Sequence, residues 1–359
     1  MSAPHATIDL DDVDGLLAAD RGGLLRAASM AGAQVRATAA ALDEGLLASV
    51  ASDQPARTLI WVAGRGNAET AGSILAAALG KSTAAPIVVC SESPPWIGAL
   101  DVLVVAGDDP GDPALVAAAA TAVRRGARVI VVAPFEGPLR DATAGRAAVL
   151  EPRLWVPDDF GLTRYLAAGL AVLQAVDSGV RTDLAALADD LDAEALRNSA
   201  SRELFTNPAK ALADRMSGRS VVLAGDNAAT LAVAHHAGAI LLRVAHHAVA
   251  AVSLADAIVA LRTGFGGDPQ ADREASLFHD DEIDGPLRPR VRTFALALDA
   301  ERAVVSARVA GLDDVDVVGA EDVPDLPESP VRPGGIEQQL AMLAVRFEMA
   351  ATYLRLVQG

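Results

Sequence analysis

The stretch from Thr58 to Gly80, TLIWVAGRGNAETAGSILAAALG, constrains the fold of this chain more than any other. An apolar run ends at a glycine-containing turn, and apolar residues then recur at helical spacing. A buried strand, a tight glycine turn and a helix open a doubly wound α/β domain. Ligands bind at the carboxyl ends of such strands, so the turn is our first candidate for a binding crevice. Its candidate substrate-binding residues are Gly64, Arg65, Gly66 and Asn67.

The turn fits neither of the two common nucleotide-binding glycine loops. Gly64 and Gly66 occupy the first two glycine positions of a dinucleotide fingerprint, but Glu69 stands at the third. The segment 80–82 ends like a triphosphate loop, but it follows a helix, and Leu75 stands where the first glycine belongs. Two readings stay open: an anion-binding turn at a helix N-terminus, and a tight turn that binds nothing.

The remaining pattern predicts two α/β domains, each built on a parallel sheet. Apolar runs alternate with helical patterns, which favours right-handed crossovers between parallel strands. A second strand, glycine turn and helix recur about 160 residues after the first. We predict strands at 59–63, 86–90, 99–107, 128–133, 147–150, 220–224, 293–298 and 315–318. We predict helices at 9–44 (broken at Gly22-Gly23), 114–125, 158–178 (capped by Asp158-Asp159), 228–250 and 336–356, with a surface helix and connector at 180–206.

These elements suggest three parts of the chain. Residues 1–180 would hold N-terminal helices and the first sheet domain, and residues 181–325 the second sheet domain. Residues 326–359 would be a Pro-rich linker and a terminal amphipathic helix. Residues 264–290 are rich in Gly, Asp and Pro, which is typical of a solvated loop and also of loops that carry function.

Composition narrows the classes of function. The net charge of −17 and the lack of a basic run disfavour nucleic acid and anionic membranes as partners. A single cysteine cannot form an internal disulfide or a cysteine metal site. No run approaches the roughly 18 apolar residues of a membrane span, and the N-terminus lacks a signal-peptide pattern. We therefore expect a cytoplasmic protein. We also expect no metal site, because His235 and His246, 11 residues apart on a predicted helix, would lie roughly 16 Å apart, too far to share one ion.

Six stretches, in order, resemble one known family. They are DVDGLLAADRGGL at 12–24, GRGNA at 64–68, the segment 156–173 with Arg164, NPAK at 207–210, HDDEIDG at 279–285, and Tyr353-Leu354. Together they resemble the bifunctional phosphoglucose/phosphomannose isomerases, tandem sugar isomerase (SIS) domain proteins, and within them the actinobacterial TobH-type branch.

The resemblance implies two three-layer α/β/α SIS domains in a homodimer, without a cofactor. It implies interconversion of glucose 6-phosphate or mannose 6-phosphate with fructose 6-phosphate. Arg164 matches the arginine that stabilises the enediolate, and His279 matches the histidine that assists ring opening. Lys210 lies in the segment that matches the family's helix into the second domain, and we include it among the substrate-binding candidates.

The sequence also departs from the family pattern. The family's phosphate loop is S-x-S-G-N-T-x-E, whereas residues 106–112 read AGDDPGD, with Gly107 and Asp108 as the candidate contacts. Aspartates beside a phosphate dianion would cost several kcal/mol without a cation. The family's carboxylate base is expected near 246–253, where the sequence is HHAVAAVS, so His246 or His247 is the candidate substitute.

Two functional hypotheses follow. In the first, the protein is a sugar-phosphate isomerase with Arg164 and His279 in their family roles and a displaced base. In the second, it is a catalytically degenerate relative that binds a sugar phosphate or another protein, with a regulatory role.

Overall fold

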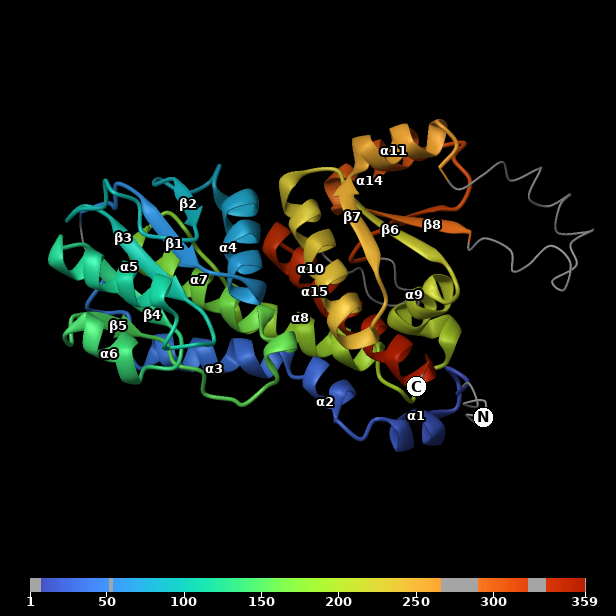
Figure 1. Ribbon diagram of the computed structural model, residues 1–359, viewed down its shortest axis with the longest axis horizontal. Coiled ribbons are helices and arrows are strands. Elements are labelled where there is room, and N and C mark those ends of the chain that lie inside the picture. The colour runs from blue at the N-terminus through green and yellow to red at the C-terminus, as the bar shows by residue number, and fades with distance from the viewer. Residues whose placement is uncertain (1–7, 52–53, 266–289, 322–333, 359) are drawn as a thin grey trace, which may run out of the picture. The chain divides into compact units, whose positions relative to one another are not determined.

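The computed structural model describes residues 8–51, 54–265, 290–321 and 334–358, and it contains two parallel sheets (Figure 1). The chain divides into two compact units. The five-strand unit comprises residues 23–196 and 335–345, and the four-strand unit comprises residues 1–22, 197–334 and 346–359. The predicted class, two α/β domains with parallel sheets, is confirmed. The boundaries at 180 and 325 stay predictions.

The five-strand unit is a sheet in the order β2-β1-β3-β4-β5 between two layers of helices. Helices α3, α4 and α7 pack on one face, and α5 and α6 on the other. Its strands are β1 (Leu59–Ala63), β2 (Ile87–Cys90), β3 (Val102–Ala106), β4 (Arg128–Val132) and β5 (Ala147–Val149). Its helices are α2 (Leu24–Ala28), α3 (Ala31–Asp43), α4 (Gly66–Leu79), α5 (Pro113–Arg124), α6 (Gly137–Thr143), the 3₁₀ turn η1 (Asp158–Phe160), α7 (Leu162–Val176) and α8 (Leu184–Arg197).

Two glycines bring α4 and α7 close to the sheet at Trp61. The Trp61 indole is fully buried and donates to the Ala68 carbonyl at 2.8 Å. A Cβ on Gly72 of α4 would lie 2.4 Å from that ring, and one on Gly169 of α7 would lie 2.1 Å from Leu75. The close packing of these helices fixes where the β1–α4 turn lies, because α4 begins there.

The four-strand unit repeats the architecture in the order β7-β6-β8-β9. Helix α10 packs on one face of the sheet, and α11 and α14 pack on the other. Its strands are β6 (Ser220–Gly225), β7 (Val249–Ser253), β8 (Val291–Leu296) and β9 (Val315–Val318). Its helices are α1 (Val13–Ala19), η2 (Leu204–Thr206), α9 (Pro208–Met216), α10 (Ala228–Ala245), α11 (Leu254–Arg262), η3 (Asp299–Glu301) and α14 (Arg302–Val309). The terminal helix α15 is Ile336–Gln358.

The predicted helix over 228–250 is wrong at its C-terminal end. Helix α10 stops at Ala245, and His246 adopts a left-handed conformation with φ 54°. Residues 249–253 then form β7, which pairs with β6. The chain reverses at His246 and His247 without a glycine, and β7 continues the pattern of alanine and valine found in α10. The sequence therefore indicated neither the turn nor the strand. Helix α10 is long and apolar enough to span a membrane, but it lies mostly buried on its sheet.

The predicted capping of the helix at 158–178 is also wrong. Asp158 and Asp159 lie in the 3₁₀ turn η1, and Gly161 is the N-cap of α7, without a side-chain hydrogen bond. The backbone carbonyls of the two aspartates accept from the Asn67 amide instead, at 2.6 and 3.1 Å. The pair therefore ties the start of α7 to the β1–α4 turn.

Candidate functional site

The strand order of the five-strand unit reverses between β1 and β3, which makes a crevice at the carboxyl ends of these strands. Strand β2 lies on one side of β1, and β3, β4 and β5 lie on the other. Such a switch point is where open α/β sheets bind ligands. The crevice is formed by the turn after β1 and the loop after β3. The predicted contacts that the structure brings to this edge are Gly64, Arg65, Gly66, Asn67, Gly107 and Asp108.

The N-terminus of α4 at this crevice has no side-chain cap. Arg65 occupies the N-cap position, and its side chain makes no capping hydrogen bond within the described residues. Unpaired N–H groups at a helix N-terminus favour an anion. The exposed Arg65 guanidinium makes no ion pair within the described residues. Asn67 is different: its side chain is buried and donates to the backbone carbonyls of η1, so it holds the turn in place.

Across the crevice, Asp108 binds Arg164 and Tyr165. Its Oδ1 atom accepts from Arg164 Nη2 and from the Tyr165 hydroxyl, both at 2.5 Å. The Arg164 guanidinium also lies over the Tyr165 ring, 4.3 Å from its centroid. Burial raises the pKa of the Tyr165 phenol, which keeps it protonated and able to donate. Arg164, to which the resemblance assigns the stabilisation of an enediolate, is thus already paired with the Asp108 carboxylate.

The other two aspartates of this loop have structural roles. Asp109 accepts from the Gly111 N–H at 2.7 Å, within the loop. Asp112 caps α5 by accepting from the Ala114 N–H at 2.8 Å. The loop that is rich in hydroxyl donors in the resembled family is therefore an acceptor-rich loop here. It offers carboxylate oxygens, which suit hydrogen-bond donors better than a phosphate.

A cavity of about 270 Å³ lies beside Asp108. Arg164 and Asp158 line it together with Pro134 and a segment that follows β5. The most exposed side chain of that segment is Trp155, of which 85% is exposed. The cavity therefore combines an open aromatic face with carboxylates.

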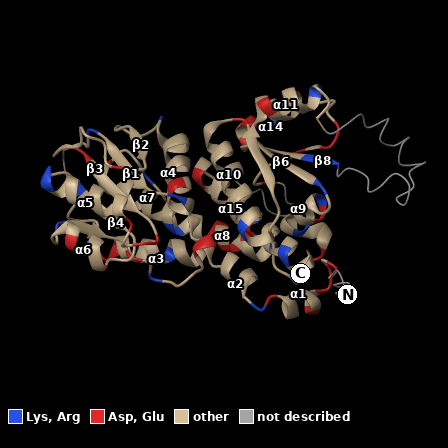
Figure 2. Cartoon of the chain, in the orientation of Figure 1, with Lys and Arg blue, Asp and Glu red and all other residues tan. Residues whose placement is uncertain are grey.

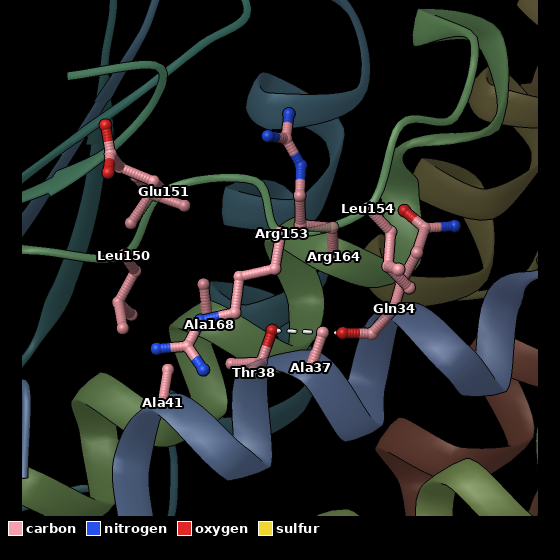
Figure 3. Close-up of a pocket in the computed structure, with 11 residues that line it drawn as sticks. Gln34, Ala37, Thr38, Ala41, Leu150, Glu151, Arg153, Leu154, Arg164 and Ala168 are labelled. Carbon is pink, nitrogen blue, oxygen red and sulfur yellow. Dashed lines mark hydrogen bonds between the residues drawn. The ribbon is translucent and has the colours of Figure 1, made fainter. Parts of the chain in front are cut away.

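A second, smaller cavity lies behind Arg164 (Figure 3). Its volume is about 20 Å³, which is enough for one water molecule and too small for a sugar. The Arg153 side chain runs toward α3 and binds Glu44 at 2.7 and 2.5 Å, whereas the Arg164 side chain points the other way. Both arginines near the cavities are thus paired with carboxylates.

The other predicted site residues lie in the four-strand unit or outside the described residues. The His246 imidazole Nδ1 lies 3.2 Å from Arg355. Burial lowers the pKa of His247, and its Nε2 has no hydrogen-bond partner within the described residues. The Lys210 ammonium is buried and donates to the carbonyls of Ala200 and Arg202, so its placement favours a structural role. His279 lies outside the described residues. The roles of these four residues stay predictions.

The corresponding crevice of the four-strand unit, between β6 and β8, is bridged by its own side chains. Asn227 caps α10 in a capping box with Thr230. Its amide also donates to Glu301 across the crevice at 2.6 Å. Asp226 forms an ion pair with Arg308 of α14. These contacts occupy the groups that a ligand would use.

The described part of the chain shows no sign of a nucleic-acid-binding surface or of a metal site. Lys and Arg are interspersed with Asp and Glu along the drawn elements (Figure 2). No group of three or more His, Cys, Asp or Glu in the described residues could hold a metal ion.

The sequence did not identify Trp155 and Tyr165 as candidate site residues. Trp155 stands between two prolines in a segment that links β5 to α7 at the carboxyl edge of the sheet. A loop at that edge was the available signal, since such loops carry binding residues. Tyr165 directly follows Arg164, but nothing local indicates that both bind one aspartate.

Solved structures with the same fold include proteins that act on sugar phosphates. The tagatose-6-phosphate ketose/aldose isomerase of Escherichia coli matches with a TM-score of 0.58 and 16% identity, over 98% of this chain and 95% of that one. A glucose-6-phosphate isomerase-like protein of Thermus thermophilus matches with 0.51 and 18%, over 98% and 94%. The C-terminal domain of a Francisella tularensis glucosamine-fructose-6-phosphate aminotransferase matches with 0.58 and 11%, over 94% and 96%.

No family model and no curated protein matches the sequence. At the identities of the structural matches, the likeness establishes the fold, which is that of the SIS-domain phosphosugar isomerases. The narrower resemblance to the phosphoglucose/phosphomannose isomerases and their TobH-type branch stays a prediction.

Proposed function

We propose that the protein binds a hexose 6-phosphate or a related sugar phosphate at the β1/β3 switch point of the five-strand unit. The observation that carries the proposal is the uncapped N-terminus of α4 beside the exposed Arg65, at the edge where this fold binds ligands. The phosphate would accept from the backbone N–H groups of the first turn. The named activities of the structural matches, which concern sugar phosphates, support the choice of ligand.

The site favours binding over turnover. Isomerisation needs a cation or oriented donors for the enediolate, and Arg164 is held by Asp108 and Tyr165. It also needs a base, and the β1/β3 crevice offers carboxylates, of which Asp108 is occupied by Arg164. We therefore expect a sugar-phosphate-binding protein with little or no isomerase activity.

Isomerisation of glucose 6-phosphate or mannose 6-phosphate to fructose 6-phosphate is the second candidate function. It is favoured by the ketose/aldose isomerase among the structural matches. In that case Arg164 would leave Asp108 during the reaction, and His279 would assist ring opening. We further expect a homodimer in the cytoplasm, and light scattering of the purified protein would check the dimer.

One experiment tests both functions. The purified chain is mixed with each hexose 6-phosphate, and its melting temperature and the formation of fructose 6-phosphate are measured. Binding to the folded state raises the melting temperature. A rise without turnover supports the binding function, and turnover that falls at least about 100-fold in Arg164→Ala supports the isomerase. If neither ester changes the melting temperature and no product forms, both candidate functions are wrong.

A further inference from the structure

The polar groups that line the cavity beside Asp108 do not suit an anion. The phosphate of a ligand is therefore not the group that this cavity binds. Its two arginines are each paired: Arg164 with Asp108 at 2.5 Å, and Arg153 with Glu44. Asp158 also lines the cavity. A dianion placed here would meet carboxylates before it met an available cation, which costs free energy.

Asp108 is placed to accept from a ligand hydroxyl. Its Oδ1 takes both hydrogen bonds from Arg164 and Tyr165, and its Oδ2 accepts none within the described residues. About a third of the side chain, 35%, remains exposed. A carboxylate oxygen in this state forms a strong, charge-assisted hydrogen bond with an O–H donor.

Trp155 gives the cavity an apolar face. It is the most exposed of the three tryptophans, at 85%, compared with 47% for Trp96 and 0% for Trp61. Single exposed apolar residues are ordinary, but this one lines a cavity of about 270 Å³ that also holds Asp108. That volume lies just below the roughly 300–1,000 Å³ typical of small-molecule sites, which suits a single ring.

We propose that this cavity binds the uncharged ring of a sugar, with one ring face against the Trp155 indole and ring hydroxyls donating to Asp108. The proposal rests on the proposed function and names the part of the ligand that is recognised here. A pyranose has the matching chemistry, since its C–H groups form an apolar face and its hydroxyls project around the rim. The phosphate of an ester would lie outside the cavity, at the N-terminus of α4. The ring then supplies most of the affinity, and the phosphate at α4 adds at most about ten-fold.

Calorimetry and tryptophan fluorescence test the proposal on the full chain. Glucose, mannose and their 6-phosphates are titrated into the wild type, into Trp155→Ala, and into Trp96→Phe as a control for the loss of an exposed tryptophan. Trp96 is an exposed tryptophan that lies outside this cavity. We expect the parent sugars to bind within about ten-fold of their esters and to shift the tryptophan emission to the blue. Trp155→Ala loses at least about ten-fold in affinity for both, and Trp96→Phe keeps the wild-type affinity.

The outcomes separate this proposal from the proposed function. If the esters bind and the parent sugars do not, or if Trp155→Ala binds like the wild type, the ring site is wrong and sugar-phosphate binding stands. If the parent sugars bind through Trp155 and the esters do not bind, the ring site stands and sugar-phosphate binding is wrong. If no sugar binds in either form, both are wrong. Circular dichroism of each variant checks that it is folded; truncating a side chain as exposed as Trp155 should leave the fold intact.

Discussion

The two sheets of this chain have the same kind of switch point, but different side chains line the two crevices. Between β1 and β3, the helix N-terminus lacks a side-chain cap. Between β6 and β8, Asn227 caps the helix and also binds Glu301 on the opposite loop. The first glycines differ as well: a Cβ on Gly64 would lie 3.1 Å from a carboxylate oxygen, whereas one on Gly225 would lie 2.2 Å from a backbone nitrogen.

This difference shows that the fold alone does not specify a binding site. Each unit presents a strand, a glycine turn and a helix at a switch point, yet the four-strand unit satisfies those groups internally. The five-strand unit leaves its helix N-terminus, Arg65 and a cavity open, while Asp108 neutralises Arg164. We therefore propose that a ligand binds in the five-strand unit, and that the side-chain contacts across the four-strand crevice contribute to stability.

The largest expected effect comes from adding a methyl group at the first glycine of each turn. Gly225→Ala places a Cβ against the backbone of Leu231, which cannot move without displacing α10. We expect a loss of about 3 kcal/mol in the free energy of unfolding, at the upper end of overpacking costs. Gly64→Ala meets only the end of the Asp112 side chain and should cost less than about 1 kcal/mol. Urea denaturation measures both, and equal losses would contradict the contrast between the crevices.

A smaller effect is expected from removing the charge that neutralises Arg164. Asp108→Asn keeps the shape of the side chain and removes its negative charge, which frees the guanidinium for an anion. We expect the affinity for inorganic phosphate, measured by calorimetry, to rise about ten-fold, or about 1.4 kcal/mol. Affinity for the parent sugar should fall, because a carboxylate acceptor is lost.

Asp109→Asn is the matched control for that substitution. It removes the same charge one residue away, from a side chain that binds its own loop and no arginine. Phosphate affinity should change by less than about two-fold, because exposed charges are screened by water and salt. An equal rise in both variants would mean that only the net charge of the loop matters, and that the Asp108–Arg164 pair does not control the site.

The fold was largely predictable because buried parallel strands are continuous apolar runs. Such runs located eight of the nine described strands, and the glycine turn after β1 located the first crevice. Strand β7 was missed because Val249–Ser253 continues the pattern of alanine and valine found in α10 and follows that helix without a glycine. Its turn relies on the left-handed His246, a conformation that local sequence rarely indicates for a residue other than glycine.

The site was predictable only in part, because its chemistry depends on contacts between distant residues. Arg164 and Asp108 were both candidates, but they are 56 residues apart and their pairing is a product of the fold. The pairing offsets the charges of the two side chains, which the sequence alone does not indicate. Lys210 is a similar case, since its two backbone acceptors only become visible once the chain is folded.

The smallest effect concerns the two helix N-termini and tests the comparison most directly. Asn227→Ala removes the capping box of α10 and the hydrogen bond to Glu301, so we expect a loss of about 1 kcal/mol in unfolding free energy. Arg65→Ala should change stability by less than about 0.5 kcal/mol, because Arg65 makes no side-chain cap on α4. Urea denaturation of the two variants compares them directly. A loss in Arg65→Ala as large as in Asn227→Ala would show that Arg65 already holds the α4 turn in place. The groups of the β1/β3 crevice would then stabilise the fold as those of the β6/β8 crevice do, and they would be less available to a ligand.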